Sequence, residues 1–242
     1  MEPNVPDYIS VLFMALTFVL AALMIIGYRA ALKKSGIDVT ERKKKTRKLT
    51  LLIFFWLIFL ARISNMHFFH DWSAMPPRIA LAGLPPLVFV IYMVASGRMN
   101  TVLAIIPQHW LILIQSFRIV MEFILLFLFL DSIIPVQMTF EGKNFDILSG
   151  ITALIVAHFV YRNKVSNNII IAWNVFGLLL LLNIFVIAIL STPLPIRVFM
   201  NEPANTVVAY FPFVWLPGFV VPVAYTMHFL SIKKCLLDKN KL

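Results

Sequence analysis

The 242-residue chain has few charged residues, 13% of its composition, and a single cysteine. Soluble domains are about a quarter charged and about half apolar, whereas 61% of this chain is hydrophobic. The low charge content excludes an ordinary soluble domain and indicates a membrane protein. The single cysteine, Cys235, excludes an intramolecular disulfide. We expect it to be an ordinary reduced thiol, with palmitoylation as the alternative because it follows two lysines.

The chain also lacks the short motifs of several enzyme and pump classes. It contains no G-x-S-x-G, H-E-x-x-H or Walker A sequence, so a nucleotide-driven pump is not indicated. No lysine lies within 208–231, which leaves a retinal Schiff base there unsupported. The N-terminal segment MEPNVPDY is acidic where a signal peptide is basic, so the apolar run after it is expected to remain as a membrane span.

Seven apolar runs occupy most of the chain. A helix needs about 20 mainly apolar residues to cross the hydrocarbon core of a bilayer. The sequence therefore predicts an all-α integral membrane protein, with residues 1–242 as one domain and a bundle of seven transmembrane helices. The expected spans are 8–32, 49–69, 79–96, 106–130, 147–161, 169–191 and 208–231. The fifth is short unless Asp146 lies at the interface, and Pro85 and Pro86 interrupt the third.

Lysine and arginine are distributed unequally between the two sides of this arrangement. One side carries eight basic residues in the loop 33–48 and seven others: Arg98, Arg162, Lys164, Lys233, Lys234, Lys239 and Lys241. The opposite side carries Arg78, Lys143 and Arg197, together with the acidic residues Glu2, Asp7, Asp71, Asp131, Glu141, Asp146 and Glu202. The positive-inside rule then predicts an outside N-terminus and a cytoplasmic C-terminus in a multi-pass cell membrane. The short loops and single cysteine are compatible with a bacterial inner membrane.

The net charge of +10 thus reflects topology, and no nucleic acid partner is expected. Beyond the lipid bilayer itself, the basic loop 33–48 is a candidate for contact with anionic lipid headgroups. That the loop only fixes orientation is the simpler interpretation. The sequence carries no indication of the oligomeric state.

A polar stripe interrupts the fourth apolar run. Gln108, Gln115, Arg118 and Glu122 are separated by seven, three and four residues, which places them on one face of a helix. Ionisable residues at membrane depth are costly and mark functional sites by default. Arg118 and Glu122 at i and i+4 are expected to pair with each other.

Two interpretations of this pair remain open: an ion pair that fixes helix packing, or a centre that binds an anion or carboxylate. In the second, Glu122 is the counter-charge or proton carrier, and Arg62 or Asn183 lies nearby. We favour the second slightly, because a buried pair is poor evidence of stabilisation. It predicts a transporter or a small-ligand-binding membrane protein.

Histidines give two alternative predictions. His67, His70 and Asp71 fall within one turn near the outer surface, and with Glu141, Asp146 or Glu202 they are candidate ligands of a divalent metal in a membrane enzyme. His158 and His228 lie at similar depth and are candidate axial ligands of a b-type haem in a redox protein. Neither cofactor is required by the sequence, and simple hydrogen bonding, for His158 to Tyr225 or Asn174, is the plainer expectation.

The third and seventh runs share proline-containing segments, GLPPLVFVIYM and WLPGFVVPVAYTM. They suggest two parallel three-helix repeats joined by the fourth span. This layout is similar to that of PQ-loop and sugar-efflux transporters. However, the PQ pair Pro107-Gln108 opens the fourth run rather than the first or fifth, and no family is assigned from the sequence.

Overall fold

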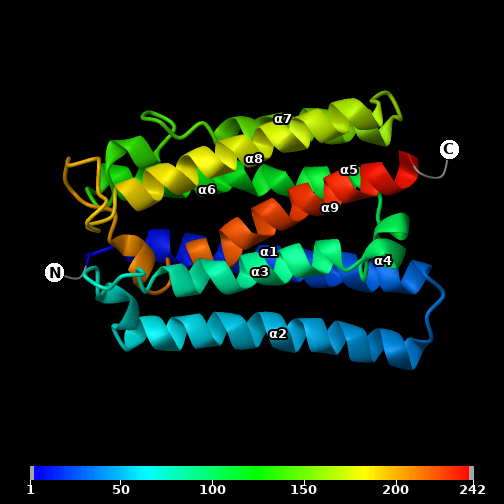
Figure 1. Cartoon of the computed structure of the whole chain (residues 1–242), viewed down its shortest axis with the longest axis horizontal. Helices are drawn as coiled ribbons and strands as arrows, with labels where there is room; N and C mark the ends of the chain where they lie inside the picture. The colour runs from blue at the N-terminus through cyan, green and yellow to red at the C-terminus, as the bar shows by residue number, and fades with distance from the viewer. Residues whose placement is uncertain (1–2, 240–242) are drawn as a thin grey trace.

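The computed structural model describes residues 3–239 as a bundle of antiparallel α-helices (Figure 1). Glu2 and Lys241, which count towards the predicted orientation, lie outside the described residues. The helices are α1 (Asp7–Lys34), α2 (Val39–Asn65), α3 (Ala80–Ala95), α4 (Asn100–Ile105), α5 (Gln108–Leu113), α6 (Phe117–Leu130), α7 (Ile147–Tyr161), α8 (Asn167–Leu190) and α9 (Val221–Lys239). A 3-10 turn, Ile114–Ser116, joins α5 to α6 in one rod, and a π-helical turn, Leu216–Val220, leads into α9.

The bundle has two different ends. At the loop end lie the start of α1 and the connections 66–79, 131–146 and 191–215. At the basic end lie the α1–α2 turn, α4, the α7–α8 turn and the end of α9, so the basic residues assigned to one side gather there. The N-terminal segment and the end of α9 therefore lie at opposite ends (Figure 1). Which end faces the cytoplasm stays a prediction.

The all-α, multi-pass membrane class is confirmed. Five elements are long and apolar enough to cross a membrane: α1, α2, the rod Gln108–Leu130, α8 and Leu216–Lys239. The helices α3 and α7 have 16 and 15 residues. At 1.5 Å per residue they measure roughly 24 and 22 Å, short of the ~30 Å hydrocarbon core. Seven complete crossings stay a prediction.

Helix α9 is the centre of the packing. The apolar window of Leu216–Lys239 is 61% buried, whereas that of α2 and that of α8 are each 22% buried. Helices α8, α5, α3 and α4 pack around α9, while α7 covers α5 and α6. Helix α2 packs against α1 at the rim of the bundle (Figure 1). From Leu51 to Phe59 its outer surface is exposed phenylalanine, leucine and isoleucine that suits contact with lipid.

Two side chains fasten α2 to the irregular start of the last helix. Pro222 has no N–H to donate to the carbonyl of Gly218, its normal helical acceptor. The Trp56 indole donates to that oxygen instead, at 2.8 Å, and the Trp215 indole donates to the Leu57 carbonyl at 2.9 Å. Tryptophan thereby satisfies a backbone group that proline frees, as is required away from water.

Two helices begin at residues other than the predicted span boundaries. The segment 33–48 is not a loop: only Ser35–Asp38 turns, and α2 begins at Val39 because Asp38 accepts a hydrogen bond from Thr40 N at 2.7 Å. The last span, predicted at 208–231, begins at Leu216 and continues to Lys239. Residues 207–215 are mostly buried but form a 3-10 turn and further turns, and hydropathy does not distinguish such a segment from a helix.

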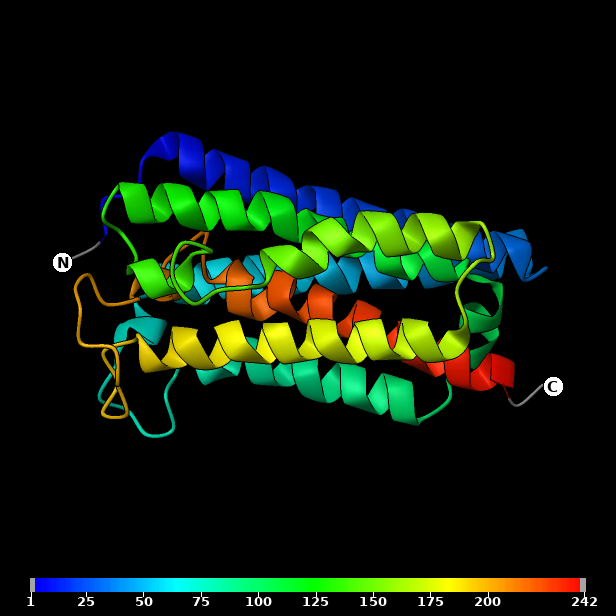
Figure 2. The ribbon, with the colours of Figure 1, turned by 90° about the horizontal axis from the view of Figure 1, so that it is seen from above.

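The connection 131–146 is not a simple surface loop. Ile134, Met138, Thr139 and Asn144 are all buried, and α7 starts well inward of the end of α8 in two perpendicular views (Figures 1 and 2). The folded segment fills the space that α7 leaves. Irregular backbone at membrane depth is tolerated only where protein buries it or where it lines a cavity. The buried, irregular segment 131–146 is therefore a candidate part of a functional site.

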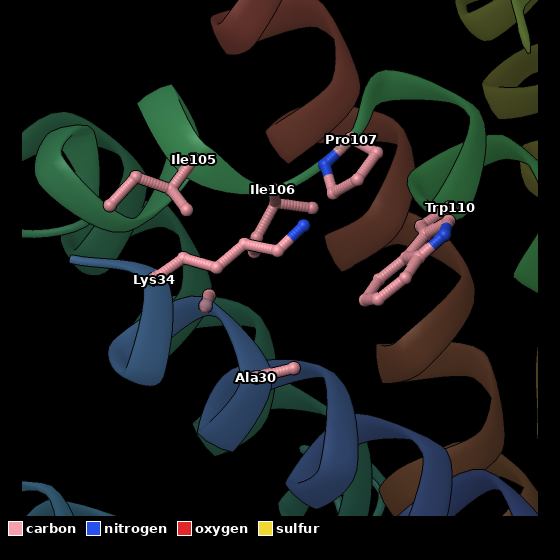
Figure 3. A pocket seen from close by; sticks show the side chains of 7 residues that line it. Ala30, Lys34, Ile105, Ile106, Pro107 and Trp110 are labelled. Atoms are coloured by element: carbon pink, nitrogen blue, oxygen red, sulfur yellow. The ribbon is translucent and has the colours of Figure 1, made fainter.

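A small hollow at the basic end separates α1 from the turn between α4 and α5 (Figure 3). The Lys34 side chain extends across it, with Nζ 5.9 Å from the centre of the Trp110 ring. Alanine, isoleucine and proline side chains form the other walls. The cation–π contact joins α1 to α5, so we assign this hollow a packing role.

Candidate functional site: a buried cluster of Arg118, Asp146 and Glu122

Arg118 lies in the first turn of α6, near the middle of the rod Gln108–Leu130, and its side chain is 2% exposed. Its Nη1 donates to Asp146 Oδ1 at 2.7 Å and, more weakly, to the Gly177 carbonyl oxygen at 3.4 Å. The ion-pair partner is thus Asp146, and the predicted pair with Glu122 is wrong. Removing one partner of such a buried pair typically costs about 3–5 kcal/mol.

Glu122 is positioned by Asn144. Asn144 Nδ2 donates to Glu122 Oε1 at 2.6 Å and to the Met138 carbonyl oxygen at 3.1 Å. Asn144 Oδ1 accepts from Asp146 N at 3.0 Å. Because a carbonyl oxygen only accepts, the contact with Met138 fixes which end of the Asn144 amide faces Glu122. The segment 131–146 therefore supplies the partners of both charged residues of α6.

Asp146 occupies the N-cap position of α7, but its side chain makes no capping hydrogen bond. Asp146 and Asn144 are of the residue types that commonly cap the start of a helix. Their side chains turn instead to Arg118 and Glu122, so they belong to the site.

Gln115 links the cluster to α9. Its Nε2 donates to the Ala224 carbonyl oxygen at 2.9 Å, and its backbone lies in the 3-10 turn within the rod. A 3-10 turn in the middle of a helix often marks a hinge or a strained sequence. The polar stripe on one face is as predicted, because Gln108 also faces α9 and donates to Ser231 Oγ at 2.7 Å.

His228 extends the polar groups on the other side of Gly177. His228 Nδ1 lies 2.8 Å from Asn174 Oδ1, and Asn174 Nδ2 donates to the Ile170 carbonyl and to Ser231 Oγ, both at 2.8 Å. Since Asn174 Oδ1 is the acceptor, His228 Nδ1 carries the proton and Nε2 of the neutral ring offers a lone pair. His228 was predicted as a haem ligand, and its hydrogen bond with Asn174 was not predicted.

Several buried polar atoms of this region have no hydrogen-bond partner within the described protein: Gln115 Oε1, Arg118 Nε and Nη2, Glu122 Oε2, Ser149 Oγ, Tyr225 Oη and His228 Nε2. A buried polar group left unpaired costs about 1–3 kcal/mol. A gathering of such groups, both donors and acceptors, is therefore suited to binding a polar ligand.

Arg62 and Asn183 do not join the cluster. Arg62 is exposed on α2. Asn183 donates to the Lys143 carbonyl oxygen at 2.8 Å and so anchors the segment 131–146 to α8. Charge and polarity alone suggested these two residues, because the sequence does not show which face of α2 or α8 meets α6.

The three predicted metal ligands each contact side chains of the protein. His67 Nδ1 and His70 Nδ1 lie 2.9 Å apart, His70 packs on Tyr210, and Asp71 pairs with Arg78 at 2.7 Å. Within residues 3–239, no three His, Cys, Asp or Glu side chains are grouped as a metal site requires. The metal prediction for His67, His70 and Asp71 gains no support from this arrangement and stays a prediction.

The predicted haem pair is not formed either. His158 is exposed on α7, whereas His228 is fully buried and packs against Trp173 and over Gly177. A haem would need both imidazoles to flank one slot. Within residues 3–239, His158 makes no hydrogen bond with Tyr225 or Asn174; Asn174 contacts His228 instead. Cys235, also buried, contacts Gln108 and does not face lipid as a palmitoylated thiol would.

A family model described as "Domain of unknown function (DUF8737)" matches residues 76–236, which is about two thirds of the chain. The matched range begins just before α3 and contains every residue of the cluster. No curated protein and no solved structure matches the chain.

Proposed function

Since the chain belongs to the DUF8737 family, whose description assigns no activity, we propose a function from the buried cluster: transport of a small zwitterionic solute together with a proton. The observation that carries the proposal is Arg118, buried in mid-helix beside two carboxyl groups and with one edge of its guanidinium group unbonded.

The free edge of Arg118 determines the kind of group that binds. Nη1 is occupied by Asp146, while Nε and Nη2 are buried and without a protein partner. Nε and Nη2 present parallel N–H groups, the geometry that binds both oxygens of a carboxylate. A carboxylate of the solute is therefore the group that Arg118 binds.

Charge balance selects a zwitterion over a simple anion. The cluster has one arginine and two carboxyl groups, Asp146 and Glu122, and an unbalanced buried charge is costly. Asp146 pairs with Arg118, so Glu122, whose hydrogen bond comes from a neutral amide, carries the proton. A zwitterion adds no net charge to this neutral site, and Gln115 Oε1 is an acceptor for its ammonium group.

Irregular backbone beside the cluster supports transport rather than static binding. The 3-10 turn at Gln115, the segment 131–146 and the π-helical turn before α9 interrupt the helices around the site. Transporters commonly bind solute near the bilayer midplane, between discontinuous helices whose segments rearrange. Release of the proton from Glu122 would then accompany release of the solute.

The same proposal includes the placement in the membrane. All seven helices that run along the bundle cross the bilayer, the loop end faces outside and the basic end faces the cytoplasm of a bacterial inner membrane. The supporting observation is the gathering of lysine and arginine at one end. Residues 33–48 then lie beside anionic headgroups.

Thermal stability in the presence of matched amino acid derivatives tests the solute class. Each common amino acid is supplied as the free zwitterion, as the C-terminal amide and as the N-acetylated acid. At about 100 times its Kd a bound solute stabilises the fold by about 2.7 kcal/mol, a rise in Tm of roughly 5–10 °C. We expect at least one zwitterion to raise Tm and its two derivatives not to.

Arg118→Lys is the matched variant. Lysine keeps the positive charge that pairs with Asp146 but lacks the two parallel N–H groups of the guanidinium group. We expect this variant to fold and to lose the rise in Tm. Arg62→Lys, the same change on the exposed face of α2, should retain it. A rise caused only by N-acetylated acids, no rise with any compound, or an unchanged response of Arg118→Lys contradicts the proposal.

Uptake into proteoliposomes tests the proton. An inward proton gradient should accelerate uptake of the responding amino acid by wild-type protein. Glu122→Gln keeps the side-chain shape and an oxygen for Asn144 but carries no exchangeable acidic proton. We expect it to exchange solute without responding to the gradient; acceleration equal to that of the wild type would remove Glu122 as the proton carrier.

A further inference from the structure

We infer that the groove between the basic-end halves of α1 and α2 binds the phosphate group of one anionic phospholipid. This inference rests on the proposed contact of the basic end with anionic lipid and assigns that contact to one built site. It is separate from the Arg118 cluster, which lies in other helices.

The groove exists because 39–48 is helical. Arg29 of α1 lines it together with Thr40, Arg42, Lys43, Lys44, Thr46, Arg47, Thr50 and Leu51 of α2. Its volume of about 730 Å³ lies within the roughly 300–1,000 Å³ of small-ligand sites. The space is thus large enough for a phospholipid headgroup.

The charges of the groove are largely uncompensated. Lys44 lies 4.0 Å from Glu41, but within residues 3–239 no carboxylate pairs with Arg29, Arg42, Lys43 or Arg47. Arginine binds phosphate oxygens through two parallel N–H groups, and basic pockets between transmembrane helices bind acidic headgroups. The charge pattern therefore selects an anionic group of the phosphate type.

The hydroxyl groups point to the same ligand. Thr46 Oγ1 is buried and has no hydrogen-bond partner within the described residues. It lines the groove between the arginines, where it can donate to a phosphate oxygen. Threonine in this place provides specificity that the positive charge alone does not.

The position of the groove along the bundle favours a lipid over a soluble phosphate. Its last residue, Leu51, is 62% exposed, and Phe55, one turn further along α2, is 68% exposed. The basic residues therefore lie next to the start of the apolar surface of α2, which is the depth of the headgroups in a bilayer. A phosphate held by the groove would place its acyl chains along Leu51 and Phe55.

The second basic-end hollow offers a contrast. There the one cation, Lys34, lies against Trp110 and the remaining walls are apolar (Figure 3). Unlike this hollow, the α1–α2 groove combines several uncompensated cations with hydroxyl groups, so it is the place to test.

Native mass spectrometry of the full-length protein, titrated with phosphatidylglycerol in detergent, counts bound lipids. We expect one molecule to bind to the wild type more tightly than further molecules do. Phosphatidylcholine, whose headgroup is neutral overall, and glycerol 3-phosphate, which lacks acyl chains, should bind much more weakly. Unchanged Tm values establish that the variants are folded.

Two double variants on the same helix remove equal charge. Lys43→Gln with Arg47→Gln removes residues that line the groove, whereas Lys45→Gln with Lys48→Gln removes residues that do not. We expect the Kd of the first lipid to rise about tenfold or more in the lining pair and less than about threefold in the other pair.

The outcomes distinguish one specific lipid site from a general attraction of the basic end to anionic lipid. Equal losses in both double variants mean diffuse attraction and overturn the built site. Equal affinity of the wild type for phosphatidylglycerol and phosphatidylcholine overturns the contact with anionic lipid altogether. Tight binding of glycerol 3-phosphate identifies a soluble phosphate ligand and overturns the lipid.

Discussion

Gly177 is the residue at which α8 passes between Arg118 and His228. A Cβ atom there would lie 2.4 Å from His228 Cε1 and 2.7 Å from Nε2, closer than real Cβ atoms approach other atoms. The His228 ring is held in place by its hydrogen bond to Asn174. Because the Gly177 carbonyl also accepts from Arg118, one glycine brings the backbone of α8 against both polar groups.

Gly177→Ala should therefore lower stability. Inserting one methyl group into a tightly packed interface costs about 1–3 kcal/mol. The control is Gly27→Ala in α1, where a Cβ would meet no atom within 4 Å. We expect a lower Tm for Gly177→Ala in detergent and no decrease for Gly27→Ala; equal Tm values would mean that His228 moves aside freely.

The segments 131–146 and 191–206 are the elements that form the loop end, and side chains join them. Gln137 Nε2 donates to Ser191 Oγ at 2.9 Å, and Asn201 Nδ2 donates to Gln137 Oε1 at 2.8 Å. Arg197 Nη1 pairs with Glu202 Oε1 at 3.0 Å within the second segment. Each segment thus helps to hold the other in its conformation. Because Asn144 and Asp146 lie in segment 131–146, their placement also depends on segment 191–206.

The pKa of Glu202 is lowered by its hydrogen bond from Arg197 and also by the backbone N–H of Ala204. A carboxyl group with a depressed folded-state pKa stabilises the fold above its unfolded pKa, and that contribution is lost as pH falls through the folded value. We expect lower hydrogen-exchange protection factors, which are rates corrected for the intrinsic exchange rate at each pH, for segment 191–206 at acidic pH. In Arg197→Gln the protection factors should already be lower at neutral pH and should fall less on acidification, because the pKa of Glu202 returns towards its unfolded value. Identical pH profiles of the two proteins would contradict a role for the ion pair.

At the scale of the whole molecule, the start of α1 and the end of α9 lie at opposite ends of the bundle (Figure 1). The one cysteine is buried and is expected to react slowly with thiol reagents. Single cysteines introduced at exposed positions can therefore report which end faces outside.

Met75→Cys at the loop end and Lys45→Cys at the basic end test the orientation. In intact bacterial cells, a membrane-impermeant maleimide should label Met75→Cys, and it should label Lys45→Cys only after the cells are permeabilised. The unmodified protein is the control for Cys235. The reverse labelling pattern would invert the proposed topology, and labelling of both sites in intact cells would contradict opposite faces.

The site residues that follow helical spacing in the rod Gln108–Leu130 could be predicted from the sequence. The i, i+3 and i+4 spacing placed Gln115, Arg118 and Glu122 on one face, and the structure has them there. The partners Asn144 and Asp146 come from a non-helical segment without periodicity. In EGKNFD they resemble an ordinary turn and helix cap, and only the inward fold of 131–146 brings them to α6.

Most of the helices could also be predicted from the pattern of apolar residues. The helix boundaries that differ from the prediction share one cause. Hydropathy reports burial or lipid contact rather than backbone conformation. The basic stretch 39–48 was excluded from α2 although lysine and arginine are good helix formers. Conversely, the apolar residues 208–215 were assigned to a helix that begins only at Leu216.

The tryptophan contacts of α2 have an optical consequence. Trp56 and Trp215 are two of the five tryptophans, and each indole donates to backbone at the contact between α2 and the start of the last helix. Indole emission depends on hydrogen bonding and on the polarity around the ring. A rearrangement of the π-helical turn would thus change the intrinsic fluorescence of the protein, so the chain carries its own reporter of that movement without any attached dye.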